Sequence, residues 1–238
     1  MSWEKEKYCQ DLTKFAEVIT KHDDTGYISG GLGALYRIAG QIQKGDSLRH
    51  EIEDVVLTIH KKISGTVPIE VRTLSINIGC ICDIDVNLDP NKHDIIKEYS
   101  LQLEIIGYTD EGQYLNCWHL DKDIPPSDGG IHNHTHPSYH FQSGGRRVEE
   151  LNTGQLLLLG APRLPHPPMD IFLAIHFVIN NFFGKSDYIF LESLFDDPDY
   201  QDILARAKQR MFVPYFQAFK EGCTHQDFNI GKIFPLAV

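Results

Sequence analysis

The sequence lacks several features that assign a chain quickly to a class of protein. No apolar run approaches the ~18–20 residues that a membrane-spanning helix needs, and the first residues, Met-Ser-Trp-Glu-Lys-Glu-Lys, are charged where a secretion signal is apolar. Cysteines number only five, an odd and scattered set that does not resemble a disulfide framework. These absences predict a cytoplasmic protein with no membrane segment.

Basic residues are also scarce, and they are not clustered. Lys and Arg number 22 against 33 Asp and Glu, which gives a formal net charge of −11 at pH 7, and no Lys/Arg run is longer than two. Proteins that bind extended nucleic acid use cationic side chains to neutralise phosphates. Extended nucleic-acid binding is therefore disfavoured, whereas a small anionic substrate in a local pocket and a protein partner both stay compatible with the composition.

The N-terminal quarter of the chain is predicted to be helical. Apolar side chains recur at helical spacing in residues 2–20, 30–44 and 47–63. Residues 1–64 are therefore expected to form an N-terminal helical layer. The apolar stripe of the third segment consists of Leu48, Ile52, Val55, Ile59 and Ile63.

A glycine cluster, Gly30-Gly-Leu-Gly33, opens the second helical segment. It lacks the Lys-Ser/Thr pair of a phosphate-binding P-loop, and no strand signal precedes it. Close helix packing or a loop is therefore preferred to a phosphate site for these glycines.

An antiparallel sheet is expected over about residues 71–159. Apolar residues occupy every even position of 74–88 and the odd positions are mostly polar, which is the period of a half-buried strand. A strand of that length predicts a bend or bulge near Gly79. Residues 100–108 and 113–120 read as two further strands, joined by a short turn that contains glycine.

Residues 160–238 are expected to begin with an extended proline-rich segment and to continue as helices. Four prolines within 160–169 exclude a helix there, and Asp170 is placed to cap an apolar helix over 171–183. Residues 187–193 are predicted to be a strand or edge segment.

Together these segments predict a single α+β domain over residues 1–238. It would contain the helical segments of residues 1–64, a curved antiparallel sheet within 65–159, and C-terminal helices from 160–238 packed on one face of the sheet.

The candidate site is the stretch 131–147, which holds four of the chain's 12 histidines. His132, His134 and His136 alternate, so in an extended strand their imidazoles project from one face, ~6.6 Å apart. Imidazoles at this spacing can converge on one ion with Zn–N distances of ~2.0–2.1 Å. These three histidines are therefore predicted metal ligands.

Two residues later in the stretch are predicted to be catalytic. Pro137 interrupts the strand, so His140 is expected either to complete the metal site or to act as a general acid or base beside it. Arg146 and Arg147 follow Gly144-Gly145, an arrangement that suits phosphate or carboxylate binding by Arg147, with a charged hairpin turn as the open alternative. Two alternatives are open for the stretch: acid–base or substrate contacts without a metal, and structural or solvent-exposed histidines.

The spacing His134-x-His136-x-x-x-His140, followed by Gly144, resembles part of the cupin metal motif. The resemblance is confined to these residues and implies a metal held by the histidines. Cupins have Glu where this chain has His140, and the second cupin motif is not found in the sequence.

Asp83 and Asp85 form a competing candidate site. They lie on the polar side of the strand pattern, and paired carboxylates at this spacing hold Mg²⁺ for phosphoryl or nucleotidyl transfer. The Asp-x-Asp arrangement resembles the acidic strand of nucleotidyltransferases and primases, although the Gly-Ser element that precedes it in nucleotidyltransferases is missing. Cys117, His119 and His166 are further candidate ligands.

The leading hypothesis is a metal-dependent hydrolase that acts on a phosphorylated or nucleotide-like substrate. Its cofactor would be Zn, Fe or Mn at the histidines, or Mg if Asp83 and Asp85 are the site. One alternative is a non-catalytic interaction or regulatory module. The other is Mg-dependent nucleotidyl transfer by the Asp-x-Asp pair.

Overall fold

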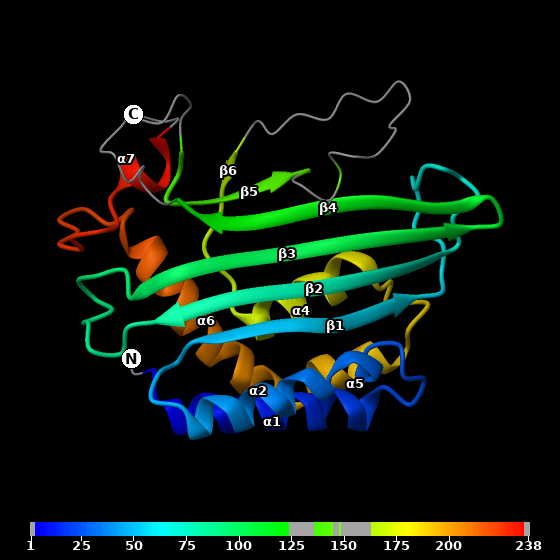
Figure 1. Ribbon diagram of the computed structural model, residues 1–238, viewed down its shortest axis with the longest axis horizontal. Helices are drawn as coiled ribbons and strands as arrows, with labels where there is room; N and C mark the ends of the chain where they lie inside the picture. Colours follow the sequence, from blue (N-terminus) through cyan, green and yellow to red (C-terminus); the bar gives the residue numbers. More distant parts are fainter. Residues whose placement is uncertain (1–2, 124–135, 145–147, 149–162, 236–238) are drawn as a thin grey trace.

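A six-stranded antiparallel sheet forms the centre of the fold, and each strand pairs with the next one along the chain, in the order β1-β2-β3-β4-β5-β6 (Figure 1). The computed structural model describes residues 3–123, 136–144, 148 and 163–235. The strands are β1 His50–Ile59, β2 Thr73–Ile84, β3 Ile96–Thr109, β4 Gly112–Lys122, β5 Tyr139–Ser143 and β6 Leu164–Pro165.

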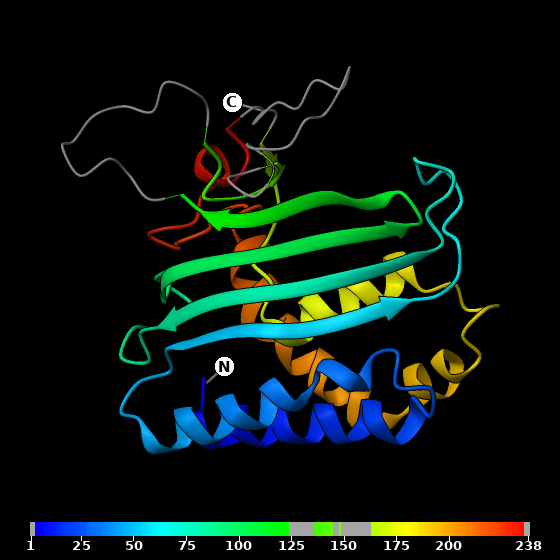
Figure 2. The same cartoon turned by 45° about the vertical axis from the view of Figure 1, so that its right-hand side comes forward.

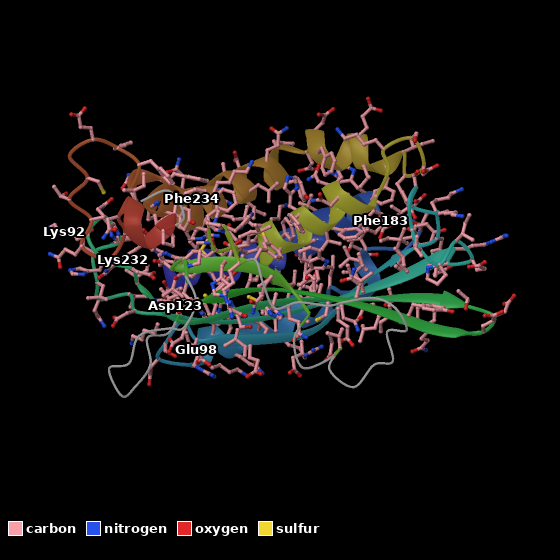
Figure 3. All side chains as sticks on the ribbon, turned by 90° about the horizontal axis from the view of Figure 1, so that it is seen from above. Lys92, Glu98, Asp123, Phe183, Lys232 and Phe234 are labelled. Carbon is pink, nitrogen blue, oxygen red and sulfur yellow. The ribbon has the colours of Figure 1, made fainter. Side chains whose placement is uncertain are left out.

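Helices from both ends of the chain pack against one face of this sheet, as the view from above shows (Figure 3). The N-terminal helices lie along β1, and α4 and α6 cross behind the sheet (Figure 2). The predicted α+β class is therefore confirmed. The helices are α1 Lys5–His22, η1 Ser29–Gly31, α2 Gly33–Lys44, α4 Ile171–Phe182, α5 Phe190–Asp196, α6 Pro198–Gln217 and α7 Ile230–Ile233.

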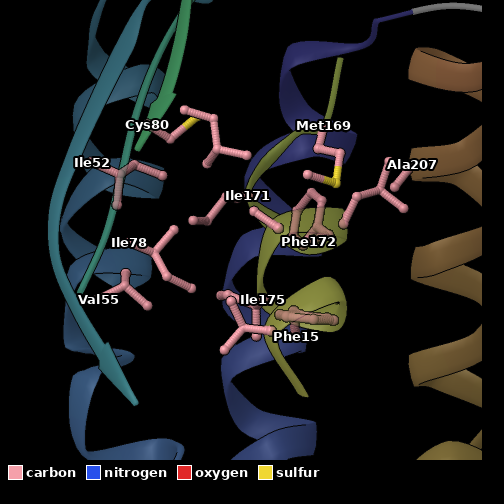
Figure 4. Packing of buried hydrophobic residues seen from close by; sticks show 14 of the residues in the cluster. Phe15, Ile52, Val55, Ile78, Cys80, Met169, Ile171, Phe172, Ile175 and Ala207 are labelled. Carbon is pink, nitrogen blue, oxygen red and sulfur yellow. The ribbon is translucent and has the colours of Figure 1, made fainter. Parts of the chain in front are cut away.

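The core lies between the sheet and α4, as the apolar composition of that helix predicts. Asp170 caps α4 by accepting a hydrogen bond from the Leu173 N–H at 3.1 Å. Ile171 and Ile175 face the strands, while Phe172 faces α1 (Figure 4). There Phe172 meets Phe15 edge to face, with ring centroids 5.2 Å apart.

The helix predicted over 47–63 is wrong, because these residues contain β1. Asp54 has a φ of 69°, and the β1–β2 register shifts between Ile52 and Val55. This bulge inserts one extra residue into the strand. The extra residue gives Ile52, Val55 and Ile59 a spacing that imitates one face of a helix. The sheet therefore begins at residue 50 instead of about 71, and the helical segment of the chain ends earlier than residue 64.

Two other local predictions are also corrected. The bulge expected near Gly79 lies on the neighbouring strand, because the β1–β2 register shifts between Ile52 and Val55, whose partners Cys80 and Ile78 flank Gly79; the β2–β3 register runs unbroken through Gly79. Consistent with this continuous register, the sheet is not strongly curled, in contrast to the curvature predicted (Figure 1). The segment 187–193, expected as a strand or edge, leads into α5, which buries Leu191 and Leu194 at helical spacing.

Gly31 allows the chain before α2 to lie against β1. A Cβ atom on Gly31 would stand 2.4 Å from the Val56 nitrogen and 2.6 Å from its carbonyl oxygen. Nearby, the Thr58 N–H donates to the Tyr27 carbonyl at 2.8 Å. Close packing against β1 therefore accounts for this glycine, as the sequence favoured.

The variant Gly31→Ala is expected to lose about 1–3 kcal/mol of unfolding free energy, because the new methyl group forces a backbone shift. Gly30→Ala is the matched control, since a Cβ atom there meets nothing within 4 Å. Urea unfolding of both variants measures the difference. Equal stability of the two variants would show that the contact with Val56 is not tight.

Within the described residues, no helix is both long and apolar enough to cross a membrane.

Candidate functional site

The face of the sheet opposite the helices, called here the outer face, carries a cluster of polar side chains near its β4–β5 end. Along β4, Leu120 and Lys122 face the helices, so His119 and Asp121 face outward. The register places Asp121 opposite His140 of β5 and His119 opposite Gln142. The antiparallel pairing therefore brings together residues that are distant in the sequence.

Asp121 lies between a hydroxyl group and an imidazole. Ser100 of β3 donates a hydrogen bond from its Oγ to Asp121 Oδ1 at 2.9 Å. His119 Nε2 lies 3.9 Å from the other carboxylate oxygen, Oδ2. The carboxylate is thus held by one neighbour and placed to orient the ring of the other.

His136 and His140 meet at the same end of the sheet. Their ring centroids are 5.5 Å apart, and the rings are nearly perpendicular, at 83°. Two imidazoles bound to one tetrahedral ion would have centroids roughly 5 Å apart, given Zn–N distances of ~2.0–2.1 Å. The separation of these two rings is therefore close to that of a pair of ligands to one metal.

The Nδ1 atoms of both rings face oxygen atoms. His136 Nδ1 lies 3.1 Å from Asp123 Oδ1, and Asp123 lies where β4 ends (Figure 3). His140 Nδ1 lies 3.3 Å from the Pro137 carbonyl oxygen. The hydrogen bond to the Pro137 carbonyl fixes the tautomer of His140 and directs its Nε2 away from that contact.

Burial lowers the pKa of His140, although the Pro137 carbonyl and the carboxylate of Asp121 oppose this effect. The positive charge of Arg163 lowers the same pKa further. His140 is only 4% exposed, so its neutral form is favoured near neutral pH. A neutral imidazole is the form that binds a metal or accepts a proton.

Gln142 Oε1 and Arg163 Nε are buried near this cluster and have no hydrogen-bond partner among the described residues. Arg163 directly precedes β6, which pairs with β5 at Phe141 and His140. Buried polar groups in proteins are nearly always satisfied by protein, water or a bound group. A water molecule or a bound group beside His140 would satisfy both atoms.

The predicted site residues have different positions in the structure. His132, His134 and Arg147 lie outside the described residues. His136 and His140 are brought together. Asp83 is opposite Glu98 of β3, so β3 and β4 lie between its strand and that of His140, a separation of about 14 Å at the usual strand spacing.

Asp85 lies beyond the end of β2 and is held by local contacts. Its Oδ1 accepts a hydrogen bond from the Asn87 N–H at 3.1 Å, and its Oδ2 lies 3.2 Å from Lys97 Nζ. The hydrogen bond from Asn87 and the one from Lys97 lower the pKa of Asp85. These contacts describe the carboxylate of a stabilised turn.

Two of the remaining candidate ligands, Cys117 and His166, contact groups other than the histidine pair. Cys117 Sγ accepts a hydrogen bond from Gln102 Nε2 at 3.3 Å, and the thiol is buried. His166 Nδ1 donates to the Pro167 carbonyl at 2.6 Å, and its ring lies edge-on to Phe141. His119 is the one of these three that lies within the cluster, through its contact with Asp121.

Sequence reasoning missed Ser100, Asp121, Asp123, Gln142 and Arg163. A signal was present for the two aspartates, because His119, Asp121 and Asp123 alternate along one strand and its end, as the 132–136 histidines do. Arg163 had no comparable signal, since its position near His140 depends on the short pairing of β6 with β5.

Within the described ranges, no group of three or more His, Cys, Asp and Glu side chains is arranged so that it could hold a metal ion. His136 and His140 therefore represent at most a portion of a metal site. Comparison of the chain with protein-family models, with curated proteins and with solved structures finds no match.

Proposed function

We propose that this chain is a metal-dependent hydrolase that acts on a phosphorylated or nucleotide-like substrate. The observation that carries the proposal is the pair of the buried His140 and the half-buried His136, whose separation suits two ligands of one ion. Asp123 behind His136 and the Pro137 carbonyl behind His140 resemble the outer contacts of metal-bound histidines. We assign both residues as ligands.

Further ligands would come from the neighbouring histidines of the same stretch. His132 and His134 precede His136 with alternate spacing, and zinc usually binds three or four protein groups. In this assignment His140 is a ligand, which is one of the two roles that the sequence allows. The bound ion, Zn, Fe or Mn, would activate water and polarise a phosphoryl oxygen.

The protein's own groups supply proton transfer and substrate binding. His119, with Asp121 beside it, is placed to give or take a proton on the outer face. Arg163 lies close enough to His140 to affect its pKa, and its guanidinium suits a phosphate oxygen. Arg147 stays a predicted second anion contact. A cytoplasmic location agrees with the five free cysteines, and a small anionic substrate would depend on these local arginines because the net charge of the chain is −11.

Hydrolysis of p-nitrophenyl phosphate and bis(p-nitrophenyl) phosphate by untagged protein tests this function. With zinc, iron or manganese supplied in turn, wild-type protein is expected to release nitrophenol with at least one substrate and one metal. His136→Ala and His140→Ala should each lower kcat/KM by about 100-fold or more, since each removes a ligand. Arg163→Gln should mainly raise KM, because it removes a contact to the anion.

The control is His60→Gln, which replaces an exposed histidine outside the cluster and should leave turnover unchanged. Activity that persists in chelator, or that survives both ligand substitutions, would refute the metal-dependent mechanism.

The two alternatives have different support. A non-catalytic module is favoured by the polar outer face, which the described helices leave uncovered (Figure 3). Nucleotidyl transfer has less support, because Asp85 is engaged by Asn87 and Lys97. Its test is Mg²⁺-dependent nucleotide binding, which the Asp83→Ala variant should abolish if Asp83 is a ligand.

A further inference from the structure

β1 is an edge strand of the sheet, and its two halves have different surroundings. The chain around Tyr27–Gly31 covers the C-terminal half, through the Thr58–Tyr27 hydrogen bond and the close approach of Gly31 to Val56. The N-terminal half faces α2 across a groove of ≈ 430 Å³. Figure 2 shows α2 running alongside β1. The edge of β1 is thus covered by a turn and the 3-10 helix η1 at one end and has space at the other.

The main chain of the N-terminal half is directed into this space. Thr58 donates its N–H away from β2, and main-chain groups alternate in direction along an antiparallel strand. The extra residue at the bulge shifts this alternation by one position. Before the bulge it is therefore the odd-numbered residues, Glu51 and Glu53, whose main-chain groups point away from β2. Among the described residues, no main-chain partner is found for these groups on that side.

The two walls of the groove carry different kinds of side chain. On the α2 side they include the small or apolar Ala34 and Ile38. On the strand side they include Glu51 and Glu53, both exposed, neither of which forms an ion pair within the described part of the chain. Arg37 and Arg49 also line the groove, but Arg37 lies 3.8 Å from Asp54 and Arg49 lies 3.1 Å from Glu98.

The exposed main chain and the two glutamates indicate which kind of segment the groove would bind. A strand added here would place alternate side chains towards α2 and towards the two glutamates. A second copy of this chain, paired through the same edge, would bring Glu51 and Glu53 close to their own equivalents, and like charges across a strand pair are destabilising. Lys or Arg at the alternate positions would be attracted instead.

We propose that the groove between α2 and the N-terminal half of β1 binds an extended basic segment of a partner protein by strand addition. The segment alternates small apolar residues, which face Ala34 and Ile38, with Lys or Arg, which face Glu51 and Glu53. This site lies at the opposite edge of the sheet from β5 and β6, and the inference does not depend on the proposed hydrolase function.

Fluorescence anisotropy with labelled peptides tests the proposal. The probe is a peptide of alternating lysine and valine, about eight residues long, the length of an ordinary strand. We expect micromolar binding of this peptide, and at least tenfold weaker binding of the matching glutamate–valine peptide. The double variant Glu51→Lys/Glu53→Lys should weaken binding of the lysine peptide at least tenfold and strengthen binding of the glutamate peptide. Asp110→Lys/Glu111→Lys, an equal charge change at the exposed β3–β4 turn, should leave both affinities unchanged.

Two N-methylated forms of the lysine peptide separate strand addition from simple charge attraction. One form carries N-methyl groups on the valines and the other on the lysines. Only one edge of an added strand faces β1, so one form should lose binding and the other should retain it. Equal binding of the two forms, equal effects of the two double variants, or no binding of the lysine peptide would each overturn the proposal. Dimers of the peptide-free protein that Glu51→Lys/Glu53→Lys disrupts would assign the groove to a second copy instead.

Discussion

Replacing Arg210 with methionine is expected to lower the free energy of unfolding by about 3–5 kcal/mol, because the buried Asp170 loses its cation and the buried Asp11, which keeps Arg206, loses one of its cations. Arg210 Nη2 lies 3.1 Å from Asp170 Oδ2, and Nη1 lies 3.6 Å from Asp11 Oδ2. Both carboxylate side chains are 1% exposed and that of Arg210 is 8% exposed. Burial raises the pKa of Asp170, and the positive charge of Arg210 opposes this rise.

The same guanidinium also contacts aromatic rings, which adds to the expected loss. Its central carbon lies 5.2 Å from the ring centroids of Trp3 and Tyr8, and 5.6 Å from that of Phe172. Cation–π contacts of this kind contribute about 0.5–2 kcal/mol each when partly desolvated. Arg210 lies on α6, and it therefore links this helix to α1, which carries Asp11, and to the start of α4, which Asp170 caps.

Urea unfolding of Arg210→Met and of a matched surface variant measures this effect. Lys14→Met removes the exposed Lys14–Asp199 pair, whose Nζ and Oδ2 atoms are 3.0 Å apart. Such a pair contributes no more than about 1 kcal/mol. Adding Asp170→Asn to Arg210→Met should restore some of the lost stability, since it removes the buried carboxylate that the first substitution leaves without a cation. A loss in Arg210→Met no greater than that in Lys14→Met would contradict this account of the buried network.

Lowering the pH from 7 to about 4.5 is expected to cost about 2–3 kcal/mol of stability through His50 alone. Burial lowers the pKa of His50 from 6.5 to about 4, and the ring lies against the Tyr8 hydroxyl, with His50 Nε2 3.3 Å from the oxygen. The folded state therefore holds this histidine neutral over a range in which the unfolded state binds a proton. Stability is unaffected above pH 6.5 and falls as the pH drops from 6.5 towards 4.

His50→Gln should remove this dependence, because the amide keeps a polar group near Tyr8 and does not titrate. The difference in unfolding free energy between pH 7 and pH 4.5 should be smaller in this variant by about 2–3 kcal/mol than in wild-type protein. Burial lowers the pKa of His176 in the same direction, to about 4, so some of the acid sensitivity will persist. The same pH dependence in wild type and His50→Gln would show that His50 is not the group responsible.

Much of the fold follows from local patterns in the sequence. The alternation in 74–84 marks β2, the short turn sequence marks the β3–β4 hairpin, and Asp170 marks the start of α4. β1 could not be recognised, because its bulge gives the buried residues a near-helical spacing. A bulge depends on how two strands pair, so the pattern of apolar residues within one strand does not reveal it.

The candidate site was predicted only partially, for a related reason. The His136–His140 pair depends on residues close together in the chain, and their density was visible in the sequence. The partnership of Asp121 with His140 and the position of Arg163 depend on the registers of β4–β5 and β5–β6. Registers are set by the packing of whole strands, so the neighbours of His140 cannot be deduced from its own segment.

The metal content of untagged protein, measured by mass spectrometry after purification without chelators, tests the central claim most directly. We predict about one equivalent of zinc, iron or manganese per chain, since a single cluster is proposed. The double variant His136→Ala/His140→Ala should contain none, while His60→Gln should match wild-type protein. Wild-type protein that carries no metal, and whose Tm does not rise when these metals are added, would contradict the assignment of His136 and His140 as metal ligands.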